Sequence, residues 1–228
     1  MIIDTHLHES KYSLDSLVSL EEIVDQARLI GLDGICITDH ESNEIKEEAR
    51  RLSQKTGFLI ITGAEVLTWQ GDVTVFGLEH IPQERMHAAE LIDLVVKEGG
   101  VAISAHPFRQ NNRGMGHAIR EMKLLGGVEA FNGSTEYRHN MDAYLLAQEL
   151  GLPCLGGSDA HNREKVGCYA TVFPDGIRDE QDLIQAIYAR EVYPVTYLDG
   201  QYLPFARPEE AGASGSLFSF PKLNLFNP

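Results

Sequence analysis

Cysteine is scarce in this chain of 228 residues, which contains only Cys36, Cys154 and Cys168 and no CxxC pair. This usage argues against a disulfide framework and fits a reducing compartment. The chain also lacks a basic, apolar leader at its N-terminus and any apolar run of the ~20 residues that span a membrane. We therefore expect a soluble, cytoplasmic protein with no membrane partner.

Basic residues are also few, because 19 Lys and Arg stand against 34 Asp and Glu, for a formal net charge of −15. Proteins that bind duplex nucleic acid through many phosphates usually present a basic face, so we do not expect a long duplex as partner. The acidity either serves solubility alone or includes carboxylates that bind cations. The hydrophobic share of 43% excludes disorder for the bulk of the chain.

Short apolar runs alternate with longer amphipathic segments along the chain. Strands are predicted at 2–8, 34–40, 58–62, 73–76, 101–106, 127–132, 154–159 and 169–173. Helices are predicted at 20–30, 42–56, 87–98, 116–125, 139–150 and 179–190. This alternation favours an α/β fold with a mainly parallel sheet that closes into a TIM-like (β/α) barrel, with an open doubly wound sheet as the alternative.

The signatures of nucleotide-binding folds are absent, since no GxGxxG follows the first strand and no GxxxxGK[ST] occurs. We expect one barrel domain over residues 1–200. Residues 201–228 are rich in Pro, Gly and Ser, and we expect them to form a tail that is extended on the surface or partly disordered.

Metal-type side chains stand at the ends of the predicted strands. They are His6 and His8, Asp39 and His40, Glu65, His106, and Asp159 and His161. The carboxyl ends of parallel strands meet at one rim, so these side chains should converge. One such histidine alone would more simply be a hydrogen-bonded core residue, but the repetition predicts a metal site. Imidazole and carboxylate donors without thiolate suit Zn²⁺, Mn²⁺ or Fe²⁺, and the surplus of ligands indicates two or three ions.

The spacing within these pairs predicts their directions. His6 and His8 are two apart on a strand, so both rings should point to one side, and Asp159 and His161 have the same offset. Asp39 and His40 are adjacent and should point apart. We therefore expect His40 to bind metal and Asp39 to support it.

For other polar residues near strand ends, the sequence allows two roles each. Arg109 follows the sequence AHPF, and its planar fork could clamp a phosphate or form a surface ion pair. Glu129 and Asn132 close a predicted strand and could support ligands or touch substrate.

Five motifs together resemble the PHP (polymerase and histidinol phosphatase) domain in order and spacing, over about residues 1–200. They are HLH at 6–8, TDH at 38–40, GAEV at 63–66, AHP at 105–107 and GSDAH at 157–161. The resemblance implies a distorted seven-stranded β/α barrel, up to three metal ions and hydrolysis of phosphoesters.

The resemblance also implies a ligand set. It assigns one ion to His6, His8, Glu65 and Asp159. It assigns a second ion to His106 with Glu65 as the bridge, and a third to Asp15, His40 and His161. Asp15 lies in SLDS, an imperfect match to the SxDG of the family.

One stretch departs from the family pattern. The family usually places a histidine on the strand after the GxE motif, where this chain reads GDVTVFG at 71–77. Either Asp72 or Thr74 occupies that place. Asp72 could supply an oxygen ligand instead, or it could simply be a turn residue after Gly71.

The favoured function is hydrolysis of a small phosphoester, a phosphomonoester or a short nucleotide, by a metal-activated water. His161, Asp159, Arg109 and His40 are the predicted catalytic residues. Histidinol phosphate, mononucleotides, nucleoside bisphosphates and short oligonucleotides all fit as substrates. The alternatives are a non-catalytic, regulatory metal-binding module and an amidohydrolase-type enzyme, which the TDH and GSDAH motifs fit poorly.

Overall fold

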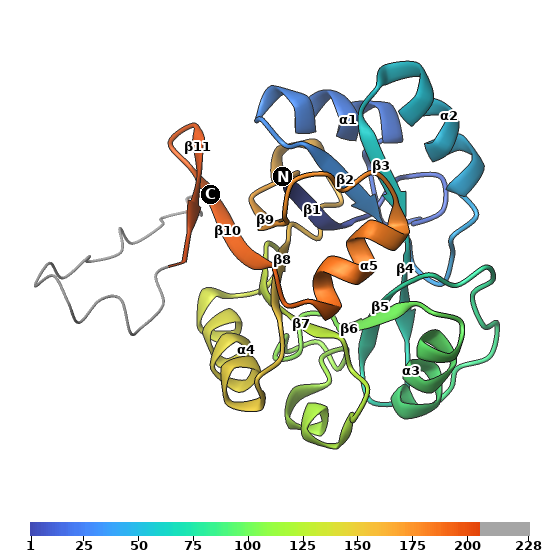
Figure 1. Ribbon diagram of the computed structural model, residues 1–228, viewed down its shortest axis with the longest axis vertical. Coiled ribbons are helices and arrows are strands. Elements are labelled where there is room, and N and C mark those ends of the chain that lie inside the picture. The colour runs from blue at the N-terminus through green and yellow to red at the C-terminus, as the bar shows by residue number, and fades with distance from the viewer. Residues whose placement is uncertain (206–228) are drawn as a thin grey trace, which may run out of the picture.

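The structure is a computed structural model and describes residues 1–205 of the chain. Its strands are β1 (Ile2–Leu7), β2 (Gly34–Ile37), β3 (Leu59–Thr62), β4 (Ala64–Leu67), β5 (Asp72–Phe76), β6 (Val101–Ser104), β7 (Gly127–Asn132), β8 (Cys154–Gly157), β9 (Tyr169–Val172), β10 (Tyr193–Leu198) and β11 (Gln201–Pro204). Its helices are α1 (Leu20–Leu29), α2 (Lys46–Thr56), α3 (Ala88–Lys97), α4 (Tyr137–Leu150) and α5 (Glu180–Tyr188), with short 3-10 helices η1 (Gly116–Glu121) and η2 (Arg163–Lys165). Figure 1 shows α1 and α2 on one side of the strands and α3 and α4 on the other.

The strands form two sheets, in the orders β11-β10-β9-β1-β2-β3 and β4-β5-β6-β7-β8. Pairing is parallel from β1 to β3 and from β6 to β8, but antiparallel at β4-β5-β6 and from β1 through β9 to β11. The prediction of an α/β fold is confirmed, but the prediction that the sheet is mainly parallel is wrong. The link from β4 to β5 spans only residues 68–71, which is too short for the crossover that parallel strands need.

The two sheets approach each other where several strands end. The chain passes from β3 to β4 through Gly63, where a Cβ atom would lie 2.5 Å from the carbonyl oxygen of Val75. Isolated parallel bridges join His40 to Glu65 and Leu7 to Ala160, and so connect the strand ends of one sheet to those of the other. The residues expected as metal ligands belong to these junctions.

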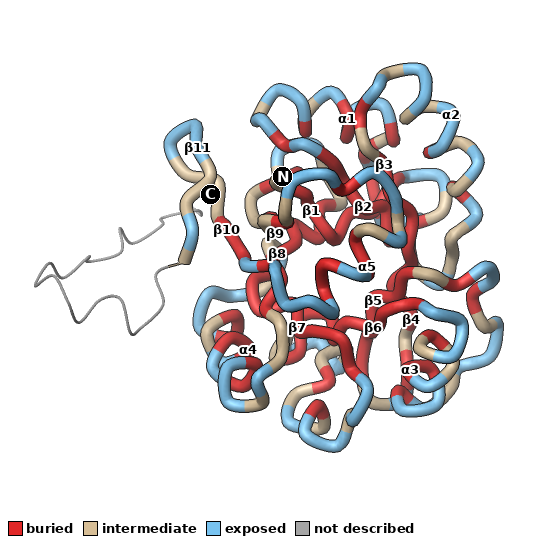
Figure 2. Tube along the Cα trace, viewed as in Figure 1, coloured by how far each residue is buried: buried red, intermediate tan, exposed pale blue. Residues whose placement is uncertain are grey.

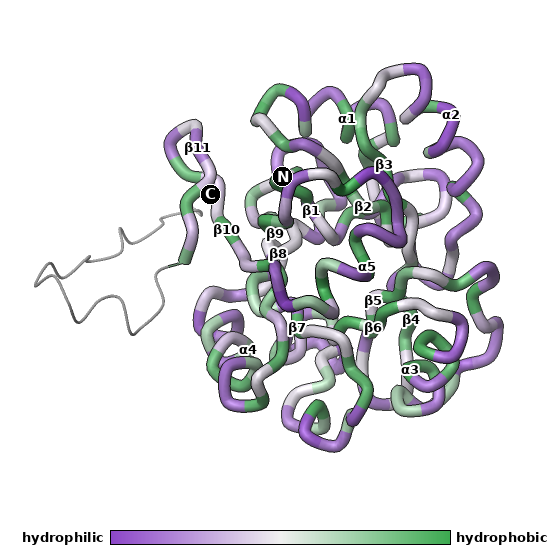
Figure 3. The backbone as a smooth tube through the Cα atoms, in the orientation of Figure 1, coloured by the Kyte–Doolittle hydropathy of each residue, from purple (hydrophilic) through white to green (hydrophobic). Residues whose placement is uncertain are grey.

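Apolar spacing in the sequence explains how the helices pack. α1 begins after Ser19, whose side chain and that of Glu22 form a capping box, and it buries its apolar stripe. α5 packs against a cluster to which both sheets contribute, including Ile3 and Cys36 from one and Ile103 and Leu155 from the other. Figure 2 shows this buried interior between the strands, and Figure 3 shows hydrophobic residues concentrated along them.

Several predicted boundaries differ from the structure. The helix expected from Ser42 begins only at Lys46, and the helix expected at 116–125 is a shorter 3-10 helix. β10 was not predicted, and the first residues of the expected tail form β11, which pairs with β10. The remainder of that tail lies outside the described residues. Within residues 1–205, no helix has the length and apolar character that crossing a membrane would need.

Candidate metal centre

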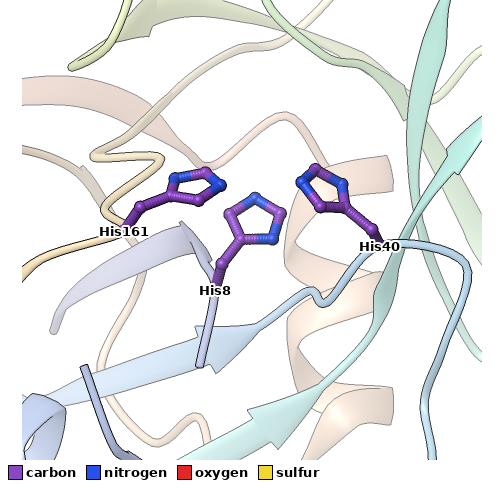
Figure 4. A group of neighbouring side chains, drawn as sticks. All are labelled: His8, His40 and His161. Carbon is purple, nitrogen blue, oxygen red and sulfur yellow. The ribbon is translucent and has the colours of Figure 1, made fainter. Parts of the chain in front are cut away.

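The ends of strands from both sheets bring together the residues that the sequence offered as ligands, except Asp15, which reaches His40 and His161 from the loop between β1 and α1. Overlapping groups of donor atoms that could hold an ion are His8 with His40 and His161, His6 with His106 and Asp159, His6 with His8 and Glu65, and Glu65 with Asp72 and His106. The donor atoms within each group lie within 4.8 Å of one another. Figure 4 shows three of these histidines, from three separate segments, with their rings close together.

The rings of His6 and His8 have the clearest geometry of a pair of metal ligands. The Nε2 atoms of the two rings lie 3.0 Å apart. The Nδ1 of His6 is 2.9 Å from the carboxylate of Glu129, which can only accept, so this nitrogen carries the proton. The Nδ1 of His8 is 3.2 Å from the hydroxyl of Ser13, which itself donates to Asp39 at 2.8 Å. In the neutral rings, both Nε2 atoms therefore direct lone pairs at one point.

Nearby carboxylates make this point attractive to positive charge. Asp159 Oδ1 lies 3.2 Å from Nε2 of His8 and 3.7 Å from Nε2 of His6. Burial by itself would lower the pKa of His6, but Glu129, Asp159 and Glu65 raise it well above its usual value. Burial lowers the pKa of His8 to about 4. The carboxylates thus favour positive charge between the two rings, and the donor set of nitrogen and oxygen atoms fits a divalent ion there.

Glu65 lies at the middle of the ligand set. Its carboxylate contacts His106 Nε2 at 2.7 Å and His40 Nδ1 at 2.8 Å, and lies 3.6 Å from Nε2 of both His6 and His8. Burial alone would raise the pKa of this carboxyl, but His6 and the hydrogen bonds from the other histidines hold it well below the usual value. A carboxylate in contact with several imidazoles has the position that a bridging ligand requires.

The partly exposed rings of His40 and His161 lie on the open side of the centre, next to the buried ring of His8. The ring centroids of His40 and His161 lie 4.2 and 4.3 Å from that of His8. Asp15 lies 3.3 Å from Nε2 of His40 and 3.4 Å from Nε2 of His161, and its side chain is 61% exposed. This group is therefore the part of the centre that solvent and a substrate can reach.

Asp72 lies beside Glu65 and His106, with a fully buried side chain. One of its oxygens is 3.7 Å from Nε2 of His106 and 2.6 Å from Nε of Arg113. Arg113 is not among the predicted site residues, because it lies in a loop without periodicity. Thr74, the other residue considered for this place, pairs with Glu65 across β4 and β5.

Arg109 lies inside the centre rather than on the surface. Its guanidinium donates to the carboxylate of Asp159 and to the side-chain oxygen of Asn132, and its Nε donates to Thr135 at 3.0 Å. The fork is therefore held next to a ligand, where an anion bound to the centre could reach it.

Buried groups behind the ligands hold them in place. Glu129 accepts from Nδ1 of His6, from the backbone N–H of His106 and from Asn132, at 2.9 to 3.0 Å. Asp39 accepts from the hydroxyl of Ser13, which in turn lies 3.2 Å from Nδ1 of His8 and accepts from the backbone N–H of His40. The backbone of His106 and Asp159 has positive φ, at 27° and 49°, a conformation that costs about 1–3 kcal/mol for residues with a side chain.

Comparison with known proteins identifies the family. Residues 4–149 match the model of the PHP domain, and residues 137–192 match that of a PHP-associated segment. The chain therefore belongs to the PHP domain family. An uncharacterized protein of Methanocaldococcus jannaschii is 30% identical over 143 residues, which cover 58% of this chain and 82% of that protein.

Solved structures share the fold at low sequence identity. PsfC of Pseudomonas syringae has a TM-score of 0.68 at 21% identity, over 87% of this chain and 92% of that one. A protein of Bifidobacterium adolescentis described as a "putative metal-dependent phosphoesterase" has a TM-score of 0.62 at 17% identity, over 87% and 98% of the chains. An amidohydrolase of Chromobacterium violaceum has a TM-score of 0.61 at 17% identity, over 86% and 98%. Such identities establish the fold and leave the reaction to be argued from the site.

Proposed function

We propose that the protein hydrolyses a small phosphoester, either a phosphomonoester or a short nucleotide, with two or three divalent ions of Zn, Mn or Fe. The observation that carries the proposal is the pair of facing Nε2 atoms of His6 and His8, 3.0 Å apart among carboxylates. Bound ions would supply a Lewis acid for the phosphoryl oxygens and would lower the pKa of water to give a nucleophile.

The proposal distributes the ligands over the rim of the fold. One ion would be held by His6, His8, Glu65 and Asp159. Another would be held on the open side by His40 and His161 with Asp15. Glu65 would bridge to the corner of His106 and Asp72. We infer that the two sheets act here as one distorted barrel, because the bridges at Glu65 and Ala160 join their edges.

The side chains of the chain itself have distinct tasks in this reaction. Arg109 would bind the phosphoryl oxygens through its planar fork, equally in the ground state and in the transition state. Asp159 would hold Arg109 in that orientation, through the contact described above. His161, whose Nδ1 is 3.1 Å from the backbone oxygen of Asp159, keeps Nε2 toward the open side and would hold the ion there, so the proton for the leaving oxygen would come from water. His40 would position the substrate at the end that carries the leaving oxygen.

Charge distribution supports a phosphoester over an amide, although an amidohydrolase shares the fold. Arg109 and Arg113 both contact candidate ligands and add fixed positive charge to the centre. An anionic phosphate needs such charge, whereas a neutral amide does not. An intact ligand set argues against a purely regulatory module.

Turnover by the purified full chain tests the proposal. The chain is stripped with chelator, reloaded with Mn²⁺, Zn²⁺ or Fe²⁺, and assayed on phosphomonoesters, phosphodiesters and amides. We expect hydrolysis of phosphoesters only, lost on chelation and restored by metal. In Arg109→Ala we expect mainly a raised KM, with Arg120→Ala, an exposed residue paired to Glu149, as the control. Hydrolysis of amides alone, or no metal-dependent turnover on any phosphoester, would refute it.

A further inference from the structure

A guanidinium enters the centre on the side of Asp72. Nε of Arg113 lies 2.6 Å from Oδ2 of Asp72, and Nη2 lies 4.0 Å from Oε2 of Glu65. Asp72 is fully buried, whereas the side chain of Arg113 is 34% exposed. The positive charge therefore lies between solvent and two carboxylates of a group that could otherwise hold an ion.

The backbone fixes this arginine in position. The N–H of Asp72 donates to the carbonyl oxygen of Arg113 at 2.7 Å, so the two residues are joined by main chain as well as by side chain. Gly71, with φ of 139°, faces the same loop, and a Cβ there would lie 2.5 Å from the nitrogen of Met115. A Cβ on Gly114 would lie 2.3 Å from the oxygen of Pro107. Because the backbone segments approach so closely at these glycines, the conformation of the loop is restricted. The guanidinium of Arg113 is thereby placed against Asp72.

The contact changes what this corner can bind. Glu65, Asp72 and His106 form one of the groups whose donor atoms could hold an ion. Here Oδ2 of Asp72 already accepts a short, charge-assisted hydrogen bond from Arg113. A divalent ion at this corner would have to compete with the fixed guanidinium for that oxygen and would be repelled by its charge. At the group around His6 and His8, by contrast, Arg109 contacts Oδ2 of Asp159 and leaves Oδ1 facing the two rings.

We propose that Arg113 is a built-in cation that takes the place of a tightly bound divalent ion at the corner of Glu65, Asp72 and His106. The protein then holds two ions, one at His6, His8 and Asp159 and one at the open side. The exposed nitrogens of Arg113 bind an anionic oxygen of the substrate. This inference rests on the proposed metal-dependent function and fixes the number of ions in it.

Metal stoichiometry tests the assignment without relying on activity. The full chain is stripped, dialysed against Mn²⁺ and analysed by mass spectrometry of bound metal, and binding is followed by calorimetry. Arg113→Met removes the charge and keeps the apolar stem, Arg113→Lys keeps a charge, and Arg120→Met is the matched control from an exposed ion pair. We expect two ions in the wild type, in Arg113→Lys and in the control, and a third ion in Arg113→Met, bound at least tenfold more tightly than by the wild type.

Each other outcome has a defined meaning. Three tightly bound ions in the wild type overturn the assignment without any variant, so the test survives if Arg113→Met fails to fold. An unchanged count and affinity in folded Arg113→Met, checked by circular dichroism, also overturns it. Failure of every form to bind a divalent ion would instead refute the proposed metal-dependent function, which separates the two results.

Discussion

Glu129 offers a sharp test of how the centre is held together, because it would touch no ion itself. Its Oε1 accepts from Nδ1 of His6 at 2.9 Å, and its Oε2 accepts from the N–H of His106 and from Asn132 at 2.9 and 3.0 Å. In Glu129→Gln, one carboxylate oxygen becomes an NH2 group that cannot accept. The amide oxygen keeps more bonds on the side of His106, so the ring of His6 faces the NH2 group.

The size of the effect follows from the lost bond. In Glu129→Gln, the Nδ1–H of His6 has lost its acceptor. The tautomer of His6 with the proton on Nε2, which cannot bind metal through Nε2, therefore no longer forfeits a hydrogen bond relative to the other tautomer. Removing a buried partner of a ligating histidine weakens metal binding by about 10- to 100-fold. This range equals about 1.4–2.8 kcal/mol of binding free energy. We therefore expect a Kd for Mn²⁺ or Zn²⁺ that is raised within that range, with the fold retained.

Competition with a chelating dye measures this Kd directly. Glu149→Gln is the matched control, since Glu149 is an exposed glutamate that pairs with Arg120 on the surface. We expect the control to bind metal as the wild type does. Equal Kd values for Glu129→Gln and wild type, with both folded, would show that Glu129 does not orient His6 for metal binding.

Three further predictions concern metal, catalysis and pH. Chelation should lower the melting temperature, because metal at 100 times its Kd stabilises the fold by ~2.7 kcal/mol; an unchanged calorimetric scan after verified removal would contradict this. His161→Ala and His40→Ala should each lower phosphoester turnover by more than tenfold, that is by over ~1.4 kcal/mol, while circular dichroism stays native; full activity in either would remove its catalytic role. Because the pKa of His6 is raised in the metal-free protein, metal must displace a proton there, so affinity should fall as pH falls below that raised pKa. Calorimetry in buffers of different ionisation enthalpy should show proton release, and a pH-independent Kd would contradict it.

Sequence periodicity predicted the elements well and their pairing less well. The alternation of apolar runs reflects burial, which local patterns record, so most strands and helices were predicted. Strand direction depends on the link between strands, and the turn at 68–71 makes β4 and β5 a hairpin. Alternation also predicted that the adjacent side chains of Asp39 and His40 point apart, and in the structure they contact different partners, Ser13 and Glu65.

Contacts made by loops could not be predicted from local patterns. Arg113 reaches Asp72 only because Gly71 and Gly114 let two backbone segments approach closely, and no spacing rule encodes a meeting of that kind. The role of Arg109 depended likewise on where its loop turns after His106. The ligands at strand ends could be predicted because the topology brings strand ends together. The arginines that contact these ligands lie in loops, and the topology does not determine the conformation of those loops.

The arrangement of the ligands links binding to the fold itself. His40 and Glu65 form a bridge between the two sheets, and Asp159 donates its N–H to the oxygen of His6 at 2.8 Å across the other junction. Ligands of one ion therefore come from segments that a few backbone hydrogen bonds join. An ion between them would join the sheets at the rim, where left-handed backbone at Asp159 already costs free energy. Binding and folding should thus be coupled at these junctions, and metal loss should loosen the rim before it affects the apolar core around α5.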